Sequence, residues 1–276
     1  MIDVGVNLAS SDFDADRPDV LRRAFAAGVT TLIATGTDVE SSRASVALAG
    51  CDAAGAPRVY ATAGVHPHHA REAGEAGDAG DDWPQAIAAI AESPHVVAIG
   101  ETGLDFYRDF SPRDAQRDVF RRQIELAVET GKPLFVHDRD SAGETRRILS
   151  DYRDGLADCV IHCFTGNAAE LDAYLEDGYH IGITGWICDE RRGRKLVELA
   201  PRIPADRLLV ETDAPYLLPR TIKPKPRSRR NEPAFLPWVV RQLAQCRRED
   251  PDLVAQRTHD NARRFFRLGE ASSGTE

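Results

Sequence analysis

Residues 96–137, VVAIGETGLDFYRDFSPRDAQRDVFRRQIELAVETGKPLFVH, carry the pattern that decides the fold. Two short apolar runs, Val96–Gly100 and Leu134–His137, enclose a longer segment with helical spacing. Near-continuous apolar runs are typical of strands that are buried on both faces of a parallel sheet. The stretch therefore predicts one strand–helix–strand unit of an α/β protein.

The helix of this unit is predicted over residues 111–130. Ser111 is the expected N-cap, Pro112 follows it, and Asp114 completes an S-x-x-D box. Gly131 is expected to end the helix. The face that lies against the sheet is predicted by an apolar stripe at helical spacing, formed by Phe120, Ile124, Ala127 and Val128.

The same alternation continues in both directions along the chain. Six further strands are expected, at Ile2–Val6, Thr31–Thr35, Val59–Ala63, Cys159–His162, His180–Thr184 and Leu208–Glu211. Eight strand–helix units without a hairpin signal favour a closed (β/α)8 TIM-like barrel over an open, doubly wound sheet. A dinucleotide-binding fold is further disfavoured because no GxGxxG motif follows the first strand. The length of 276 residues suits such a barrel, so one domain over residues 1–276 is expected.

Composition narrows the class of protein. The chain is 42% hydrophobic and 29% charged, as globular proteins are, and no apolar run approaches the roughly 20 residues of a membrane span. The five cysteines include no CxxC pair, which argues against a thiolate zinc site or a disulfide framework. The first residues lack a basic leader. We expect a cytoplasmic monomer with no membrane partner.

The charge of the chain gives conflicting indications about a nucleic-acid ligand. The net charge of −9 argues mildly against a polyanionic ligand. Basic residues nevertheless cluster in two places. Residues 220–230 contain no acid and include Arg220, Lys223, Lys225, Arg227, Arg229 and Arg230, and a second cluster consists of Arg191, Arg192, Arg194 and Lys195. Such runs are either solvated surface or contacts to nucleic acid.

Polar side chains stand at the carboxyl ends of the predicted strands, where barrel enzymes build their active sites. They are His66 and His68 after the third strand, Glu101 after the fourth, His137 and His162 at the ends of the fifth and sixth, and Glu211 and Asp213 at the eighth. A lone histidine here would more often be a core residue, and Glu101 could simply pair with an arginine. Burying so many titratable groups at one rim is costly unless a divalent cation holds them together. The sequence therefore predicts a metal site.

The expected ligands are Glu101, His137 and His162, a set that suits Zn, Mn, Co or Fe better than Mg. Asp213 is expected to be a further ligand or the base that accepts a proton from the attacking water. Glu211 is expected to brace the site. No lysine ends a predicted strand, which disfavours the barrel amidohydrolases that bridge two metals with a carbamylated lysine.

Eight short stretches, spread in order over nearly the whole chain, resemble the TatD family of metal-dependent nucleases. They are DVGVNL at 3–8, AGVHPH at 63–68, GETGLD at 100–105, VHDRD at 136–140, IHCFTG at 161–166, GITGW at 182–186, ETDAPYL at 211–217 and RRNEP at 229–233. No single stretch is decisive, but the ordered set is specific.

This resemblance implies a TIM-like barrel and metal-dependent hydrolysis of phosphodiester bonds in single-stranded DNA or RNA, often by a 3′-to-5′ exonuclease. It implies ligation of a divalent cation by Glu101, His137, His162 and Asp213, with Glu101 and Asp213 as the catalytic residues. Mg or Mn would act in function, and Zn or a similar ion could be bound in the purified protein.

Two positions depart from the family pattern. Most members carry on the first strand an HxH pair that holds a second metal, but Gly5 and Asn7 stand there in this chain, as in the TatD subgroup proper. One tightly bound ion is therefore predicted in the resting enzyme. The residue after the strand-five histidine is Asp138, where the family often has cysteine, and this side chain is expected to face solvent.

Phosphodiester hydrolysis also needs side chains that hold phosphate. The expected substrate contacts are His66, His68, Arg139, Arg229, Arg230 and Asn7. Trp186 could stack on a base or cap the barrel.

Two other functions are weighed. A D-aminoacyl-tRNA deacylase would use the same metal site and basic rim, so the sequence barely separates it from a nuclease. A non-catalytic binding barrel would not need the complete set of glutamate, two histidines and aspartate, and it is disfavoured.

Overall fold

The structure is a computed structural model that describes residues 1–50, 53–75 and 83–269 of the chain. Within these residues eight parallel strands form one sheet in chain order, and each strand pairs with the next. The strands are β1 (Ile2–Val6), β2 (Thr31–Ala34), β3 (Arg58–Ala63), β4 (Val96–Asp105), β5 (Leu134–Arg139), β6 (Cys159–His162), β7 (His180–Ile183) and β8 (Leu208–Val210).

The two ends of the sheet meet and close the barrel. Asp213 N donates to Gly5 O at 2.9 Å and Asn7 N donates to Ala214 O at 2.8 Å, so the segment after β8 continues the ladder along β1. The predicted eight-stranded TIM-like barrel is confirmed. Its carboxyl ends bring residues from distant parts of the sequence to one rim.

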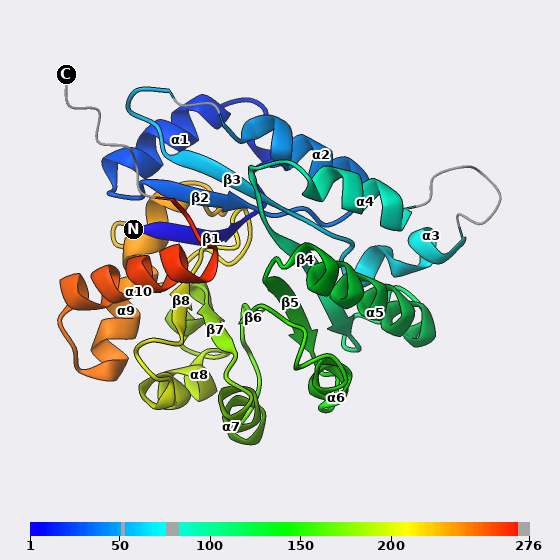
Figure 1. The fold of residues 1–276 in the computed structure, drawn as a ribbon. Helices are drawn as coiled ribbons and strands as arrows, with labels where there is room; N and C mark the ends of the chain where they lie inside the picture. Colours follow the sequence, from blue (N-terminus) through cyan, green and yellow to red (C-terminus); the bar gives the residue numbers. More distant parts are fainter. Residues whose placement is uncertain (51–52, 76–82, 270–276) are drawn as a thin grey trace.

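Helices surround the strands in the ribbon view (Figure 1). The α-helices are α1 (Arg17–Ala26), α2 (Val39–Leu48), α3 (Ala70–Glu75), α4 (Trp83–Ala91), α5 (Arg113–Thr130), α6 (Glu144–Ser150), α7 (Ala168–Glu176), α8 (Arg194–Leu199), α9 (Leu236–Arg247) and α10 (Pro251–Phe265). Short 3₁₀ turns are η1 (Ser11–Phe13), η2 (Pro67–His69), η3 (Gly185–Cys188), η4 (Ala200–Arg202) and η5 (Pro233–Phe235). None of the described helices combines the length and the apolar composition that crossing a bilayer requires.

A buried apolar cluster fills the interior of the barrel beneath the carboxyl ends of the strands. Val4, Ile33, Ala98, Phe135, Val160 and Leu209 come from six different strands and pack together with Phe265 and Phe266 at the end of α10. Interdigitated side chains of this kind fill a barrel solidly rather than leaving a pore. The site above therefore rests on a packed floor, which fixes the strand ends that carry it.

The start of α5 differs from the prediction. The helix begins at Arg113 with Pro112 as its N-cap, and no side chain caps it. Ser111 Oγ instead donates to His68 O at 2.8 Å and accepts a hydrogen bond from Arg71 N at 3.0 Å. The predicted capping role of Ser111 was wrong, because its hydroxyl finds partners in the loop after β3. Gly131 ends the helix as predicted, with φ of 63°.

Candidate active site

A cavity of about 560 Å³ opens at the carboxyl ends of the strands. Its walls combine titratable, basic and aromatic side chains, and they include Asn7, His66, His68, Glu101, Asp105, Arg108, Phe110, His137, Arg139, His162, Trp186, Arg192, Asp213 and Tyr216. Most of the side chains predicted at strand ends therefore face one space. This space is the candidate active site.

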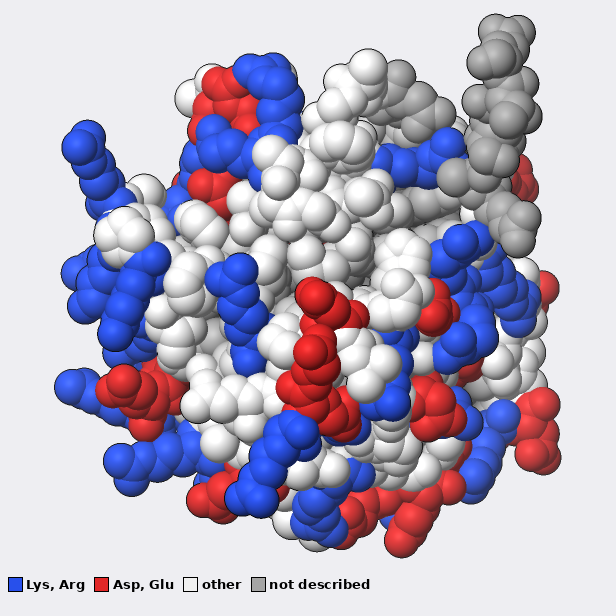
Figure 2. Space-filling model, turned by 90° about the vertical axis from the view of Figure 1, so that its left-hand side faces the viewer, with Lys and Arg blue, Asp and Glu red and all other residues white. Residues whose placement is uncertain are grey.

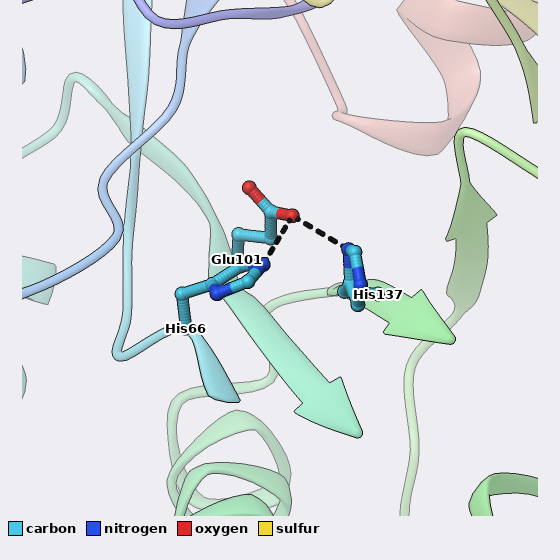
Figure 3. Close-up of side chains that lie close together, drawn as sticks. All are labelled: His66, Glu101 and His137. Atoms are coloured by element: carbon cyan, nitrogen blue, oxygen red, sulfur yellow. Dashed lines mark hydrogen bonds and ion pairs between the residues drawn. The ribbon is translucent and has the colours of Figure 1, made fainter. Parts of the chain in front are cut away.

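Three imidazoles converge on one oxygen of Glu101. Glu101 Oε1 lies 3.2 Å from His66 Nε2, 3.1 Å from His137 Nδ1 and 2.7 Å from His162 Nε2. Figure 3 shows the Glu101 carboxylate between His66 and His137. The four residues belong to the loop after β3 and to β4, β5 and β6, so adjacent strands of the barrel position them.

The charges of this group are strongly coupled. Burial alone would raise the pKa of Glu101, but His162 and His66 outweigh it and hold that pKa well below its usual value. Burial alone would lower the pKa of His162, but Glu101 and Glu211 raise it well above the usual value. The pKa of His66 falls to about 4, mainly because that ring is buried. Glu101 is thus an ionised carboxylate enclosed by imidazoles.

The donor set fits a divalent cation. One carboxylate oxygen accepting from three ring nitrogens requires a proton on each ring, and a bound cation would replace those protons. His137 Nε2 is buried without a hydrogen-bond partner among the described residues, and Asp105 Oδ2 lies 3.4 Å from it. One ligand atom each from His66, Glu101 and His137 lies within 4.8 Å of the others. Imidazole nitrogen and carboxylate oxygen are common ligands of transition-metal ions and Mn.

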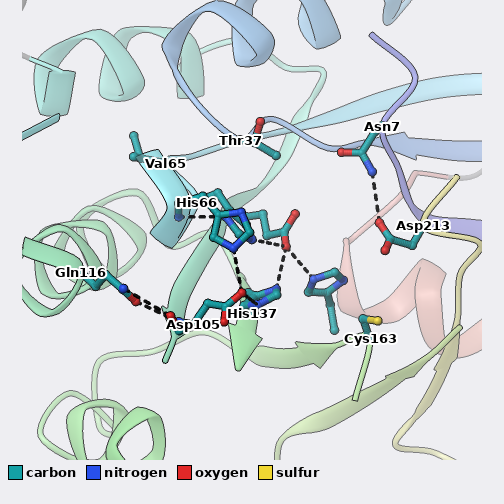
Figure 4. Close-up of polar contacts among 12 residues, drawn as sticks. Asn7, Thr37, Val65, His66, Asp105, Gln116, His137, Cys163 and Asp213 are labelled. Carbon is teal, nitrogen blue, oxygen red and sulfur yellow. Dashed lines mark hydrogen bonds and ion pairs between the residues drawn. The ribbon is translucent and has the colours of Figure 1, made fainter. Parts of the chain in front are cut away.

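His66 and Asp213 occupy different positions relative to Glu101. His66, expected to contact substrate, lies with the candidate ligands. Asp213, expected to be a further ligand or the base, lines the same cavity, and its Oδ1 accepts a hydrogen bond from Asn7 Nδ2 at 3.1 Å (Figure 4). Burial is the main cause that raises the pKa of Asp213 to about 7. Asn7 is placed to orient this carboxylate.

Asp105 is a site residue that the sequence reasoning missed. Its Oδ2 lies 2.7 Å from His68 Nε2, and its Oδ1 accepts hydrogen bonds from the backbone N–H groups of Tyr107 and Arg108. Burial would raise the pKa of Asp105, but the neighbouring His137 and His68 rings hold it well below its usual range. The available signal was its position four residues after Glu101, on the same side of an extended strand.

Glu211 braces His162 from the side opposite Glu101. Its carboxylate is fully buried, with Oε1 accepting a hydrogen bond from Cys163 N at 2.6 Å and Oε2 lying 3.4 Å from His162 Nδ1. A carboxylate on the second ring nitrogen fixes the orientation of a ligating histidine. Two glycines leave room for it, because a Cβ at Gly182 would lie 2.6 Å from Oε1 and one at Gly5 would overlap Oε2.

Gly5→Ala is expected to destabilise the protein, because the added methyl group competes with the Glu211 carboxylate for space. Overpacking of this kind costs about 1–3 kcal/mol, which lowers the Tm of a chain of this size by roughly 2–10 °C. Thermal unfolding measures the change. The double variant Gly5→Ala with Glu211→Asp, which withdraws the carboxylate, should recover part of the loss. An unchanged Tm for Gly5→Ala would contradict the tight fit.

Asp138 does not face solvent as predicted. The side chain is half-buried on the outer face of β5, where Thr145 Oγ1 donates to Oδ1 at 3.2 Å and the Tyr174 hydroxyl donates to Oδ2. The prediction that Asp138 faces solvent was wrong, because the alternation of side chains along the strand turns this residue towards α6 and α7.

The predicted substrate contacts divide into two groups. His68, Arg139 and Asn7 line the cavity, but Arg229 and Arg230 do not. Arg230 is held by Asp16, with NH1 and NH2 each 2.8 Å from a carboxylate oxygen, and its assignment as a substrate contact stays a prediction. Arg229 is exposed outside the lining, and its assignment stays a prediction.

Comparison with known proteins gives a consistent picture. Residues 2–267 match the family model described as TatD related DNase. A protein of Salmonella typhimurium named 3'-5' ssDNA/RNA exonuclease TatD is 47% identical over 268 residues, covering 97% of this chain and 99% of that protein. A protein of the same name from Musicola paradisiaca is 49% identical, covering 98% and 99%.

Solved structures agree on the fold. A TatD homologue from Escherichia coli, YJJV, superposes with a TM-score of 0.83 at 27% identity, covering 98% of both chains. A TatD family hydrolase from Entamoeba histolytica superposes with a TM-score of 0.85 at 24% identity, covering 96% of this chain and 97% of the other.

Proposed function

Because this chain belongs to the TatD related DNase family, we propose that it is a divalent-metal-dependent nuclease that degrades single-stranded DNA and RNA from the 3′ end. The observation that carries the proposal is the convergence of His66, His137 and His162 on Glu101 in a cavity that also presents arginine and aromatic side chains. Carboxylate and imidazole ligands serve hydrolysis, and arginines serve binding of phosphate.

Glu101, His66, His137 and His162 would hold the cation. When bound, the ion supplies Lewis-acid polarisation of the phosphoryl group and lowers the pKa of water. We propose one tightly held ion, Mg or Mn in function, with Zn or a similar ion in the purified protein. The fully buried Glu211 carboxylate occupies the space beside Gly5, so position 5 adds no ligand for a second ion.

Asp213 serves in this proposal as the general base. Its pKa of about 7, raised mainly by burial, is suited to accepting a proton near neutral pH. The hydrogen bond from Asn7 leaves the second carboxylate oxygen, Oδ2, available to the attacking water. The nucleophile would thus lose its proton to a side chain that the cavity wall holds in place.

Arg139 and His68 are the proposed contacts to phosphate in the cavity. Both side chains line it, and His68 is anchored by Asp105 at 2.7 Å. All of these groups come from one chain, so a second copy is not needed to complete the site, and a monomer is proposed. The deacylase alternative is not supported, because both relatives described above are named as exonucleases.

The test is degradation of single strands labelled at the 5′ end, DNA and RNA in parallel, with Mg or Mn and with EDTA. We expect a ladder that shortens by single nucleotides from the 3′ end with metal and no product with EDTA. A strand blocked by a 3′-phosphorothioate linkage is the control for polarity. Intact strands with every metal would contradict the proposed function, and early internal fragments would contradict the exonuclease assignment.

A further inference from the structure

We propose that a groove beside the active-site cavity carries the single strand upstream of its reacting 3′ end; this inference rests on the proposed function. The groove has a volume of about 730 Å³ and is lined by side chains that include Tyr107, Arg139, Trp186, Arg191, Arg194 and Lys195. Arg139 and Trp186 also line the cavity, so the two spaces adjoin each other. We call this space the η3–α8 groove, after the elements on one of its sides.

The charge of the groove is predominantly positive. Its lining holds five arginines and one lysine, and Asp140 is the one carboxylate among the described lining residues. None of these six cations has an acidic partner within 4 Å in the part of the chain that the structure describes, whereas Arg117 on α5 is paired with Glu144 at 2.8 Å. Cations without acidic partners are available to a polyanion.

Another part of the surface carries charges of both signs. Figure 2 shows basic and acidic side chains intermixed over the face that it draws. With a net charge of −9, the protein repels a nucleic acid at long range, so a strand must be held by a local concentration of positive charge. The groove supplies such a concentration directly beside the cavity.

Aromatic rings stand in the groove together with these cations. The Tyr107 ring is 60% exposed, and the Arg139 guanidinium lies 4.2 Å from its centroid. The Arg192 guanidinium lies 5.3 Å from the Trp186 centroid. Exposed rings interleaved with arginines are how proteins bind single strands without regard to sequence, since bases stack on the rings while cations follow the backbone.

The basic stretch 220–230 is the alternative path for the single strand, and the structure argues against it. Arg220 Nε is paired with Asp189 at 3.0 Å and Arg230 with Asp16 at 2.8 Å, so both ends of the stretch are anchored to the barrel. Between them Lys223, Lys225, Arg227 and Arg229 are exposed, and none of the four lines the cavity or the groove. The strand path therefore follows η3 and α8.

Binding measurements with two charge-matched variants test the groove. The groove variant is Arg191→Ala with Arg194→Ala and Lys195→Ala, and the control is Lys223→Ala with Lys225→Ala and Arg227→Ala. All six side chains are exposed. Both are placed in a Glu101→Gln background to prevent cleavage. Fluorescence anisotropy gives the Kd for labelled single strands of about four and about twelve nucleotides over a range of NaCl concentrations.

For the groove variant we expect the Kd of the longer strand to rise about tenfold or more, and the slope of log Kd against log salt to fall by about two. The short strand should be affected less, because it reaches little of the groove. The control should stay within about twofold of the parent protein. Equal losses in both variants, or a loss in the control alone, would overturn the proposal.

A single substitution tests the stacking surface. Tyr107→Ala should weaken binding of the longer strand about tenfold, and Tyr107→Phe, which keeps the ring, should restore it. Equal affinity of the parent and the alanine variant would remove Tyr107 from the path. Cleavage by the wild-type enzyme separates the two proposals. If the wild type forms the ladder but the groove variant binds the longer strand as tightly as its parent, the groove proposal alone is contradicted. If the wild type does not cleave the strand, the nuclease assignment is contradicted.

Discussion

Glu101→Gln is expected to remove the tightly bound cation and to slow strand degradation by at least about a thousandfold. The negative oxygen on which three imidazoles converge becomes a neutral amide oxygen, and the charge that offsets the cation is lost. The measurements are metal content by elemental analysis and the initial rate over a range of metal concentrations. Wild-type rates at saturating metal would show that Glu101 is not a ligand.

The matched control for this variant is Glu129→Gln, which makes the same chemical change at an exposed position on α5. We expect it to keep both the metal and the rate. Circular dichroism and Tm establish that Glu101→Gln is folded, as its uncharged side chain occupies the same volume. A loss of fold in that variant alone would be resolved by Glu101→Asp, which keeps the charge and should retain part of the metal.

Asp213→Asn is expected to reduce kcat by about 10²- to 10⁴-fold while the metal content stays near the wild-type value. The carboxylate is held by Asn7 in the cavity wall, and the candidate ligands surround Glu101 instead. Losing the base slows proton transfer without removing a ligand, so KM should change little. Loss of metal in parallel with loss of rate would instead make Asp213 a ligand, as the family resemblance implies.

The control for Asp213→Asn is Asp206→Asn, at an exposed position just before the amino end of β8. It removes one carboxylate from the same part of the chain without touching the cavity, and its rate should match the wild type. A second check is Asn7→Ala, which leaves Asp213 in place without its hydrogen-bond donor. We expect an intermediate loss of kcat, because a base that is free to rotate is still a base.

The barrel could be predicted because its signal is local. In the run Leu134–His137 the three apolar residues are fully buried, and consecutive apolar residues in the sequence predict such burial on both faces of a strand. The site followed from the barrel, since strand ends meet at one rim whatever lies between them. Three of the four predicted ligands, Glu101, His137 and His162, accordingly meet at one point in the structure.

The remaining assignments depended on geometry that no sequence pattern encodes. The role of His66 depends on the path of the chain between β3 and η2, where His66 Nδ1 accepts a hydrogen bond from His68 N at 3.1 Å. Asp105 reaches the site because β4 continues five residues beyond its predicted end at Gly100. Arg230 pairs with Asp16, more than two hundred positions away, and a local run of positive charge cannot reveal such a partner.

The closure of the barrel between β1 and the segment after β8 has a consequence for the chain during its own synthesis. The Asn7–Asp213 hydrogen bond joins residues 206 positions apart, and the backbone bonds of Gly5 and Ala214 span a similar separation. The first strand leaves the ribosome long before its last neighbour exists, so this seam forms late in a fold dominated by distant contacts. An unfinished chain lacks Asp213 altogether. The cavity at the carboxyl ends of the strands can therefore be completed only after the chain has been synthesised as far as Ala214.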